Sequence, residues 1–150
     1  MLRLSKKMLF ALEAVVDIAY NAGSDPVQSK EITRRQGIPQ RYLEQVMQRL
    51  VHAGVLKGVR GPRGGYRLAR ERRRVTVGQV ARVVFDMEDD SDFDYPSESP
   101  LGQKVIAPLW QQLHDEVMQK LDAVSIDDLC RRANDEGIKS DGREKLDYTI

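Results

Sequence analysis

The residues whose types and spacing favour chemistry lie between positions 28 and 69, and that chemistry is recognition of a polyanion. Arg60 and Arg63 lie in a glycine-rich turn, residues 60–65, together with Gly61, Gly64 and Gly65. Guanidinium groups bind phosphates and base edges, and glycine lets a backbone turn tightly and approach another surface closely. The pattern predicts a basic hairpin tip that contacts nucleic acid; an ordinary turn is the plainer alternative.

A second group of polar residues precedes this turn. Gln40 and Arg41 are followed at helical spacing by Glu44 and Gln45. Glutamate accepts a hydrogen bond from the cytosine amino group, and glutamine pairs with adenine through two hydrogen bonds. We therefore predict that these four side chains contact bases from the exposed start of a helix. The alternative is an ordinary solvated helix face.

Both groups must be positioned by the surrounding secondary structure, and the sequence here predicts two short helices joined by a turn. Residues 29–36 are predicted to form the first helix, with Ser29 as its capping residue and Gly37 as its left-handed stop. Ser29 is also a candidate DNA contact. Pro39 fits the start of the second helix, where its missing N–H costs little, and Gly54 ends that helix. The apolar positions of the second helix recur at helical spacing: Tyr42, Leu43, Val46, Met47 and Leu50.

Residues 55–59 and 66–68 then read as two short strands around the arginine–glycine turn. A helix-turn-helix with a basic β-hairpin beside it is a winged helix, and the second helix of such a motif enters the major groove of DNA. The predicted fold class is therefore mainly α with a small β-hairpin. It comprises a winged helix-turn-helix DNA-binding domain over residues 1–85 and a long dimerisation helix.

The charge distribution favours a nucleic-acid partner. Residues 1–74 hold 16 Lys and Arg against 6 Asp and Glu, a net charge of +10, whereas residues 75–150 hold 8 against 17, a net charge of −9. The first half therefore attracts phosphates and the second half repels them. Residues 70–74 add a run of arginines around Arg72, which is either a solvated loop or a further source of phosphate contacts.

The opening helix is predicted over residues 5–22, with Ser5 as its cap and Gly23 as its stop. Lys6 and Lys7 lie in its first turn, where a positive charge opposes the helix dipole. A DNA phosphate beside these lysines would explain their placement, and simple exposure is the alternative.

The second half of the chain is predicted to hold a dimer together. A helix over residues 77–86 leads into an acidic loop over residues 86–99, and a long helix follows within residues 101–121. Pro108 either starts this long helix or bends it. The apolar stripe of the helix repeats every four residues and would pair with a second copy of the chain: Val105, Leu109, Leu113, Val117 and Leu121.

A short helix and a polar tail complete the chain. The helix is predicted over residues 126–132, with Ser125 as its cap, and the dimerisation unit spans residues 100–133. Residues 134–150 are expected to form a flexible tail.

The single cysteine, Cys130, excludes an internal disulfide and favours a reducing, cytoplasmic location. Cys130 is either a small apolar residue of the last helix or a redox sensor whose thiol pKa is lowered by Arg131 and Arg132. We find no secretory signal, no apolar run of membrane length, no ligand-spaced His and Cys, and no nucleophile motif. We therefore expect no enzyme, no metal site and no membrane partner.

The chain resembles the Rrf-two family of winged-helix transcriptional regulators, which includes IscR, NsrR and CymR. The resemblance covers about residues 1–132, and its most specific pieces are the Tyr-Leu-Glu-Gln run at 42–45 and the Gly-Gly-Tyr run at 64–66. It implies a homodimer that binds a partly palindromic operator on double-stranded DNA, most often as a repressor. It also implies that Arg60 enters the minor groove.

One departure from the family concerns the cofactor. Cluster-binding members carry three cysteines in the loop before the dimer helix, whereas residues 86–107 of this chain contain neither cysteine nor histidine. An iron–sulfur cluster needs thiolates for most of its ligands. The resemblance therefore points to the cluster-free, CymR-like branch, and no cofactor is expected.

The final four residues carry a second resemblance. Asp147, Tyr148, Thr149 and Ile150 are similar to the C-terminal tail of serine acetyltransferases, which inserts a terminal isoleucine into cysteine synthase (O-acetylserine sulfhydrylase). Backbone amides can capture such a carboxylate while a pocket buries the isoleucine. The CymR-like branch is also known for a cysteine synthase partner, so the resemblances imply a regulator of cysteine metabolism. The alternatives are a protein-interaction module that modulates the enzyme and a redox-responsive repressor that senses through Cys130.

Overall fold

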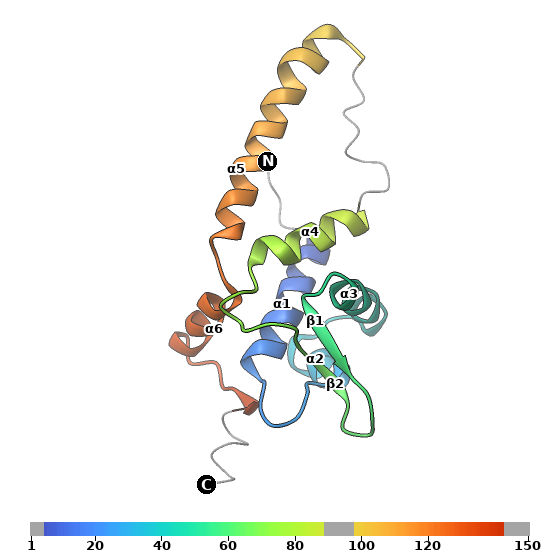
Figure 1. Cartoon of the computed structure of the whole chain (residues 1–150), viewed down its shortest axis with the longest axis vertical. Coiled ribbons are helices and arrows are strands. Elements are labelled where there is room, and N and C mark those ends of the chain that lie inside the picture. Colours follow the sequence, from blue (N-terminus) through green and yellow to red (C-terminus); the bar gives the residue numbers. More distant parts are fainter. Residues whose placement is uncertain (1–4, 89–97, 143–150) are drawn as a thin grey trace.

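The chain folds as a mainly helical protein with one β-hairpin, which confirms the predicted fold class (Figure 1). The structure is a computed structural model, and it describes residues 5–88 and 98–142. Its elements in chain order are α1 (Lys6–Tyr20), α2 (Ser29–Gln36), α3 (Gln40–His52), β1 (Leu56–Val59), β2 (Gly65–Leu68), α4 (Val77–Glu88), the π-helical turn η1 (Gly102–Ile106), α5 (Ala107–Asp122) and α6 (Ile126–Asp135).

The hydrophobic core forms where α1, α3 and α4 turn their apolar stripes toward one another. Fully buried side chains include Val15 and Ile18 of α1, Leu43 and Met47 of α3, and Val80 of α4. Burying one such side chain stabilises the fold by roughly 1.5–3 kcal/mol. The core therefore fixes α3, the predicted recognition helix, against α1. Within the two described ranges, no helix is long and apolar enough to cross a membrane.

The first helix confirms its predicted start but not its predicted end. The Ser5 hydroxyl accepts a hydrogen bond from the backbone N–H of Met8 at 3.1 Å, as an N-cap does. The helix ends at Tyr20, before the predicted stop at Gly23. At this end the backbone N–H and the side-chain amide of Asn21 both donate to the carbonyl of Asp17, at 2.9 and 3.0 Å.

The prediction that Ser29 caps α2 is wrong by one residue. Gln28 is the N-cap, and its backbone N–H donates to the Glu31 carboxylate at 3.1 Å, while Ser29 is the first helical residue. The predicted stop is correct, since Gly37 has a left-handed φ of 69°. The strands pair antiparallel, with Leu56 opposite Leu68.

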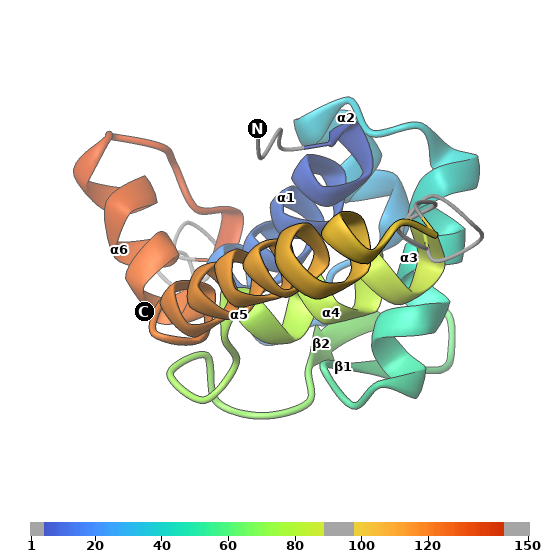
Figure 2. The ribbon, with the colours of Figure 1, turned by 90° about the horizontal axis from the view of Figure 1, so that it is seen from above.

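The long helix starts with an irregular turn that accommodates Pro108. Residues 102–106 form the π-helical turn η1, the Ala107 N–H donates to the Gly102 carbonyl, and Pro108 lies in the first turn of α5. The wider turn accommodates a residue that lacks an N–H, so the helix continues through Pro108. Seen from above in Figure 2, α5 lies across α4.

The C-terminal part of α5 is fixed to α4 by polar and aromatic contacts. The Arg82 guanidinium donates to both carboxylate oxygens of Asp122, at 2.6 and 2.7 Å, and lowers the pKa of that carboxyl. The rings of Phe85 and His114 lie 5.6 Å apart. The helix α4 also extends to Glu88, two residues beyond its predicted end.

The last helix confirms Ser125 as its cap, but its predicted end at residue 132 is too early. A capping box joins Ser125 and Asp128, and α6 continues to Asp135. The expectation of flexibility from residue 134 is also wrong for residues 134–142, because Ser140 is only 6% exposed and is packed against α1. Residues 143–150 lie outside the described residues.

Candidate nucleic-acid interface

The start of α1 lies directly against the start of α3. The Tyr42 hydroxyl donates a hydrogen bond to the carbonyl of Lys7 at 2.6 Å, and the Tyr42 ring lies 5.8 Å from that of Phe10. Lys6 and Lys7 keep their side chains exposed. The two predicted phosphate contacts therefore lie beside the first turn of the predicted recognition helix.

The Tyr42 phenol stays protonated over a wide pH range. Burial, and secondly the negative charge of Glu88, raise the pKa of Tyr42 to about 12. The neutral hydroxyl can therefore act as a constant donor to the Lys7 carbonyl, and this hydrogen bond holds the two helix starts together.

The start of α3 also contacts α2. The Gln40 side-chain amide donates to the Ser29 hydroxyl at 3.4 Å and to the Glu44 carboxylate at 3.1 Å, and it accepts from the Thr33 hydroxyl at 2.8 Å. The structure thus brings three of the predicted DNA-contacting residues together. Arg41 and Gln45 are exposed on the same helix.

The wing, residues 56–68, is joined to the helix-turn-helix by a short backbone bridge. Val27, just before α2, exchanges hydrogen bonds with Tyr66 at 3.0 and 2.8 Å. A Cβ atom on Gly65 would lie 2.4 Å from the Val27 carbonyl oxygen. The close approach predicted for the hairpin glycines is therefore, at Gly65, an approach to the chain's own backbone.

Arg67 positions the wing, a role that the sequence pattern did not indicate. Its guanidinium donates to the carbonyls of Gly23 and Ser24, at 3.3 and 2.6 Å. Nothing in the local pattern distinguishes this arginine from the other cations of the hairpin. The contact ties β2 to the loop between α1 and α2.

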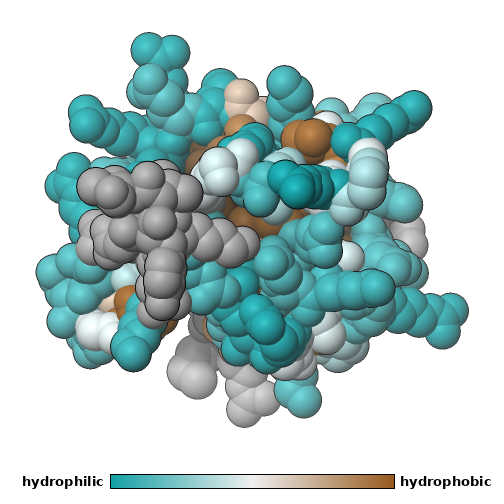
Figure 3. Space-filling model, turned by 90° about the horizontal axis from the view of Figure 1, so that it is seen from below, coloured by the Kyte–Doolittle hydropathy of each residue, from teal (hydrophilic) through white to brown (hydrophobic). Residues whose placement is uncertain are grey.

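The tip of the wing is exposed and shaped by glycine. Arg60, Gly61 and Arg63 are all exposed, and Gly61 has a φ of 113°, which strains any side chain. A Cβ atom on Gly64 would lie 2.3 Å from the Val59 carbonyl oxygen. The face that includes this end of the hairpin is predominantly hydrophilic (Figure 3).

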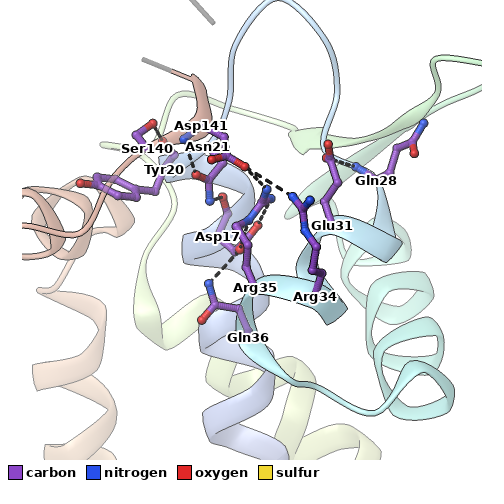
Figure 4. A network of polar contacts seen from close by, with 10 residues as sticks. All are labelled: Asp17, Tyr20, Asn21, Gln28, Glu31, Arg34, Arg35, Gln36, Ser140 and Asp141. Atoms are coloured by element: carbon purple, nitrogen blue, oxygen red, sulfur yellow. Dashed lines mark hydrogen bonds and ion pairs between the residues drawn. The ribbon is translucent and has the colours of Figure 1, made fainter. Parts of the chain in front are cut away.

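Two arginines form ion pairs within the fold: Arg72, which the sequence offered as a possible phosphate contact, and Arg35 of α2. Arg72 makes an ion pair with Asp127 at 2.8 Å and lies beside α6. Arg35 makes ion pairs with Asp17 of α1 and with Asp141, both drawn in Figure 4. The hydrogen bond to Asp17 is the main cause that raises the pKa of Arg35, so its charge is committed to the fold.

The redox hypothesis for Cys130 predicted a lowered thiol pKa, and this prediction is wrong. Cys130 is 2% exposed, and burial raises the pKa of its thiol, although Arg72 partly opposes that effect. The neighbouring Arg131 pairs with Asp127 at 2.9 Å. Cys130 is thus the small apolar core residue of the alternative interpretation.

The predicted dimerisation stripe is divided between two environments. Val105, Leu109 and Leu113 are 54%, 49% and 42% exposed, whereas Val117 and Leu121 are partly buried and Leu121 packs on the core. Trp110, at 49% exposure, widens the exposed part. The turn η1 and the N-terminal half of α5 therefore present an apolar face that the rest of the described chain leaves uncovered.

Two further predictions concern metal ligation and the partner-binding tail. Among the residues that the structure describes, no group of three or more His, Cys, Asp or Glu could hold a metal ion. Asp147, Tyr148, Thr149 and Ile150 lie outside those residues, so their role stays a prediction.

Comparison with known proteins identifies relatives over nearly the whole chain. Residues 4–132 match the family Rrf2, described as an iron-dependent transcriptional regulator. The chain is 32% identical over 149 residues to the HTH-type transcriptional regulator IscR of Enterobacter sp. (strain 638), which covers 99% of this chain and 90% of that protein.

Solved structures agree with this match. T. potens IscR has a TM-score of 0.69 and 35% identity, over 88% of each chain. CymR, the global cysteine regulator of B. subtilis, has a TM-score of 0.68 and 29% identity, over 88% of this chain and 98% of that chain. These relatives are transcriptional regulators and not enzymes, as the sequence predicted, and the chain belongs to the Rrf2 family of transcriptional regulators.

Proposed function

We propose that this regulator is a homodimeric repressor that binds double-stranded DNA through α3, the first turn of α1 and the wing. The observation that carries the proposal is that hydrogen bonds join these elements to one another. Tyr42 joins α3 to Lys7, Gln40 joins α3 to Ser29, and the Val27–Tyr66 bridge joins α2 to the wing. These contacts support one surface that could reach the major groove, the minor groove and the intervening phosphates together.

On this surface each residue has a proposed role. Gln40, Arg41, Glu44 and Gln45 would read base edges, and the hydrogen bond between Gln40 and Glu44 would be exchanged for bonds to bases. Lys6 and Lys7 would contact phosphates, and Arg60 with Arg63 would enter the minor groove.

We propose further that the regulator works without an iron–sulfur cluster, although the family description names iron. The donor set does not fit a cluster: the chain has one cysteine, and that residue is buried in α6. Fe–S ligation requires several thiolates. Anaerobically purified protein should contain neither iron nor sulfide, and its affinity for DNA should not change after treatment with a chelator.

The dimer is proposed to form through the exposed apolar face of η1 and α5. Exposed apolar side chains on a projecting helix are unfavourable in water. A two-fold axis lets the same apolar faces of two copies cover each other. Such a dimer would place two copies of α3 roughly 34 Å apart, which is one turn of DNA.

The test of DNA binding starts from a random duplex library. Sequences selected by the purified full-length chain should contain a partial palindrome with half-sites one helical turn apart. Affinity should fall steeply with salt, because contacts with about six phosphates give a slope of log K against log salt of about −5. If selection enriches no sequence and affinity is insensitive to salt, the proposed function is wrong.

Cysteine metabolism is the proposed regulatory context. The structural similarity to CymR, the global cysteine regulator of B. subtilis, supports it, as does the terminal Ile150. A cysteine synthase that held Ile150 would lie within roughly 28 Å of Gly142, because eight extended residues span no more than that. Gly142 packs tightly on the backbone of Ala22, so the enzyme would be held near the helix-turn-helix, where it could affect DNA binding.

A further inference from the structure

A groove between α1 and α6 is lined by polar and charged side chains that take no part in the proposed DNA contacts. Its volume is about 380 Å³, and its lining includes Tyr20 from α1, Arg131 and Asp135 from α6, Arg72 from the loop between β2 and α4, and Ser140. Pockets for small molecules begin at roughly 300 Å³, so the groove suits a ligand of metabolite size. Figure 1 shows α6 beside the C-terminal part of α1.

The positive side of the groove consists of two arginines that share one acid. Arg72 Nε lies 2.8 Å from Asp127 Oδ1, and Arg131 Nη2 lies 2.9 Å from Asp127 Oδ2. The side chains of Arg72 and Arg131 are 46% and 68% exposed, whereas that of Asp127 is 8% exposed. Each guanidinium carries five N–H donors, so both retain donors for a second carboxylate, and one positive charge is left over.

The negative side of the groove is Asp135, four residues after Arg131 on the same face of α6. Its carboxylate is exposed and makes no ion pair with any residue of the ranges 5–88 and 98–142. Helical neighbours at this spacing have Cβ atoms roughly 5–6 Å apart. A molecule with a carboxylate and an ammonium on one carbon can therefore satisfy both charges, whereas a simple anion would be repelled by Asp135.

The groove is lined by Ser140, which belongs to a segment that reaches the helix-turn-helix, and by Tyr20, which this segment contacts. This segment, residues 138–142, is called the strap. The Tyr20 hydroxyl donates to the Ile138 carbonyl, and the Ser140 hydroxyl donates to the Tyr20 carbonyl at 2.6 Å. The Asp141 N–H then donates to the Asn21 side-chain oxygen at 3.0 Å (Figure 4).

The strap ends on the first helix of the helix-turn-helix. Asp141 accepts a hydrogen bond from Arg35 Nη1 at 2.6 Å, and Arg34 lies 3.8 Å from the same carboxylate oxygen. A ligand that touches Tyr20 or Ser140 would displace or stabilise the strap, and the change would reach α2 through Asp141. A differential contact of this kind is what a ligand needs to shift a conformational equilibrium.

We propose that the groove binds a free amino acid, and that this ligand changes operator affinity through the strap. The carboxylate of the ligand pairs with Arg72 and Arg131, and its ammonium pairs with Asp135. The effect on DNA rests on the proposed function, whereas binding to the groove does not, and the two are measured separately.

Binding is measured first, by calorimetry on the full-length protein without DNA, with each of the twenty standard L-amino acids as the probe. At least one should bind with a Kd of about 1 mM or lower, which corresponds to about −4 kcal/mol. Its methyl ester and its N-acetyl form, which each lack one charge, should bind at least tenfold more weakly. Acetate should bind no better than the N-acetyl form.

Matched variants locate the site. Arg131→Gln and Asp135→Asn should each raise the Kd at least tenfold, whereas Arg132→Gln and Glu136→Gln, which change exposed neighbours outside the lining, should leave it unchanged. Absence of binding by every amino acid, equal binding of acetate, or binding that survives both groove variants would overturn the proposal.

The DNA measurement uses the selected operator with and without the amino acid that binds. Its affinity should change at least threefold in the wild type and stay constant in Asp141→Ala, which still binds the amino acid. Binding of the amino acid with no change in operator affinity would refute the coupling. Failure of the ligand-free protein to bind any DNA would instead count against the proposed function and leave the calorimetric result standing.

Discussion

Arg35 of α2 donates two parallel hydrogen bonds to the carboxylate of Asp17 in α1, from Nε to Oδ2 at 2.9 Å and from Nη2 to Oδ1 at 2.8 Å. The Asp17 side chain is 0% exposed and that of Arg35 only 16%. Gln36 adds a third donor to the same carboxylate at 2.9 Å. The pair therefore links the first helix of the helix-turn-helix to the core, and it also connects both to the strap.

Replacement of Arg35 should destabilise the fold strongly. Arg35→Met leaves the Asp17 carboxylate buried without its cation, and loss of one partner of a buried pair costs about 3–5 kcal/mol. The matched control is Arg34→Met, because Arg34 is 70% exposed and lies 3.8 Å from its acid; it should cost less than about 1 kcal/mol. Denaturant unfolding of both variants checks this, and equal stabilities would show that the pair is not structural.

Tyr42 should impose an alkaline limit on stability. Its pKa is raised to about 12 in the folded state, whereas an unfolded tyrosine titrates near 10. The unfolded chain therefore loses this proton first as the pH rises from about 10 to 12, and the contribution of Tyr42, at most about 2–3 kcal/mol, is present below pH 10 and lost across that window. The free energy of unfolding of Tyr42→Phe should fall less steeply there than that of the wild type; parallel curves would refute the assignment.

Arg60 should matter for operator affinity without affecting the fold. Arg60→Ala should weaken operator binding by about 1–3 kcal/mol, and its unfolding curve should match the wild type because the side chain is exposed at the wing tip. Arg73→Ala, an exposed arginine outside the wing, is the matched control and should lose much less affinity. Gel-shift titrations at one salt concentration compare them, and an unchanged affinity for Arg60→Ala would remove the wing from the interface.

Leu113 should hold the dimer together. Leu113→Asp would place an unpaired charge in an apolar interface, a burial that costs several kcal/mol, and should yield monomers. Gln119→Asp adds the same charge at another exposed position of α5 and should remain dimeric. Light scattering distinguishes the two masses. A wild-type monomer, or a dimeric Leu113→Asp, would contradict the proposed interface.

Ile150 should carry the interaction with cysteine synthase. Deletion of this residue should weaken binding of the enzyme at least tenfold, which is about 1.4 kcal/mol, and should abolish inhibition of its sulfhydrylase activity. O-acetylserine should compete with the full-length chain for the same pocket. Calorimetry and an activity assay test this together, and equal binding by the truncated chain, or no binding by either, would exclude the tail as the contact.

Local signals were sufficient for much of the DNA-binding unit. The Ser5 cap depends on a side-chain hydrogen bond to a backbone N–H three residues later, and Gly37 and Gly61 have positive φ angles that few other residues adopt. The apolar period of α3 likewise predicted which of its residues are buried, as Leu43 and Met47 show. The sequence by itself therefore determined the winged-helix fold, and the separation of charge along the chain pointed to its partner.

Tertiary structure decided which of several chemically similar residues is committed to the fold. Arg34 and Arg35 are adjacent and identical in type, yet only Arg35 reaches the buried Asp17. The arginines beside Cys130 suggested a lowered pKa, but burial raises it. Ser140 stands between the charged residues Lys139 and Asp141 in the sequence, yet it is buried on α1. Burial and ion pairing depend on groups more than a hundred positions away in the chain, as the contact between Arg35 and Asp141 shows, and no local pattern encodes them.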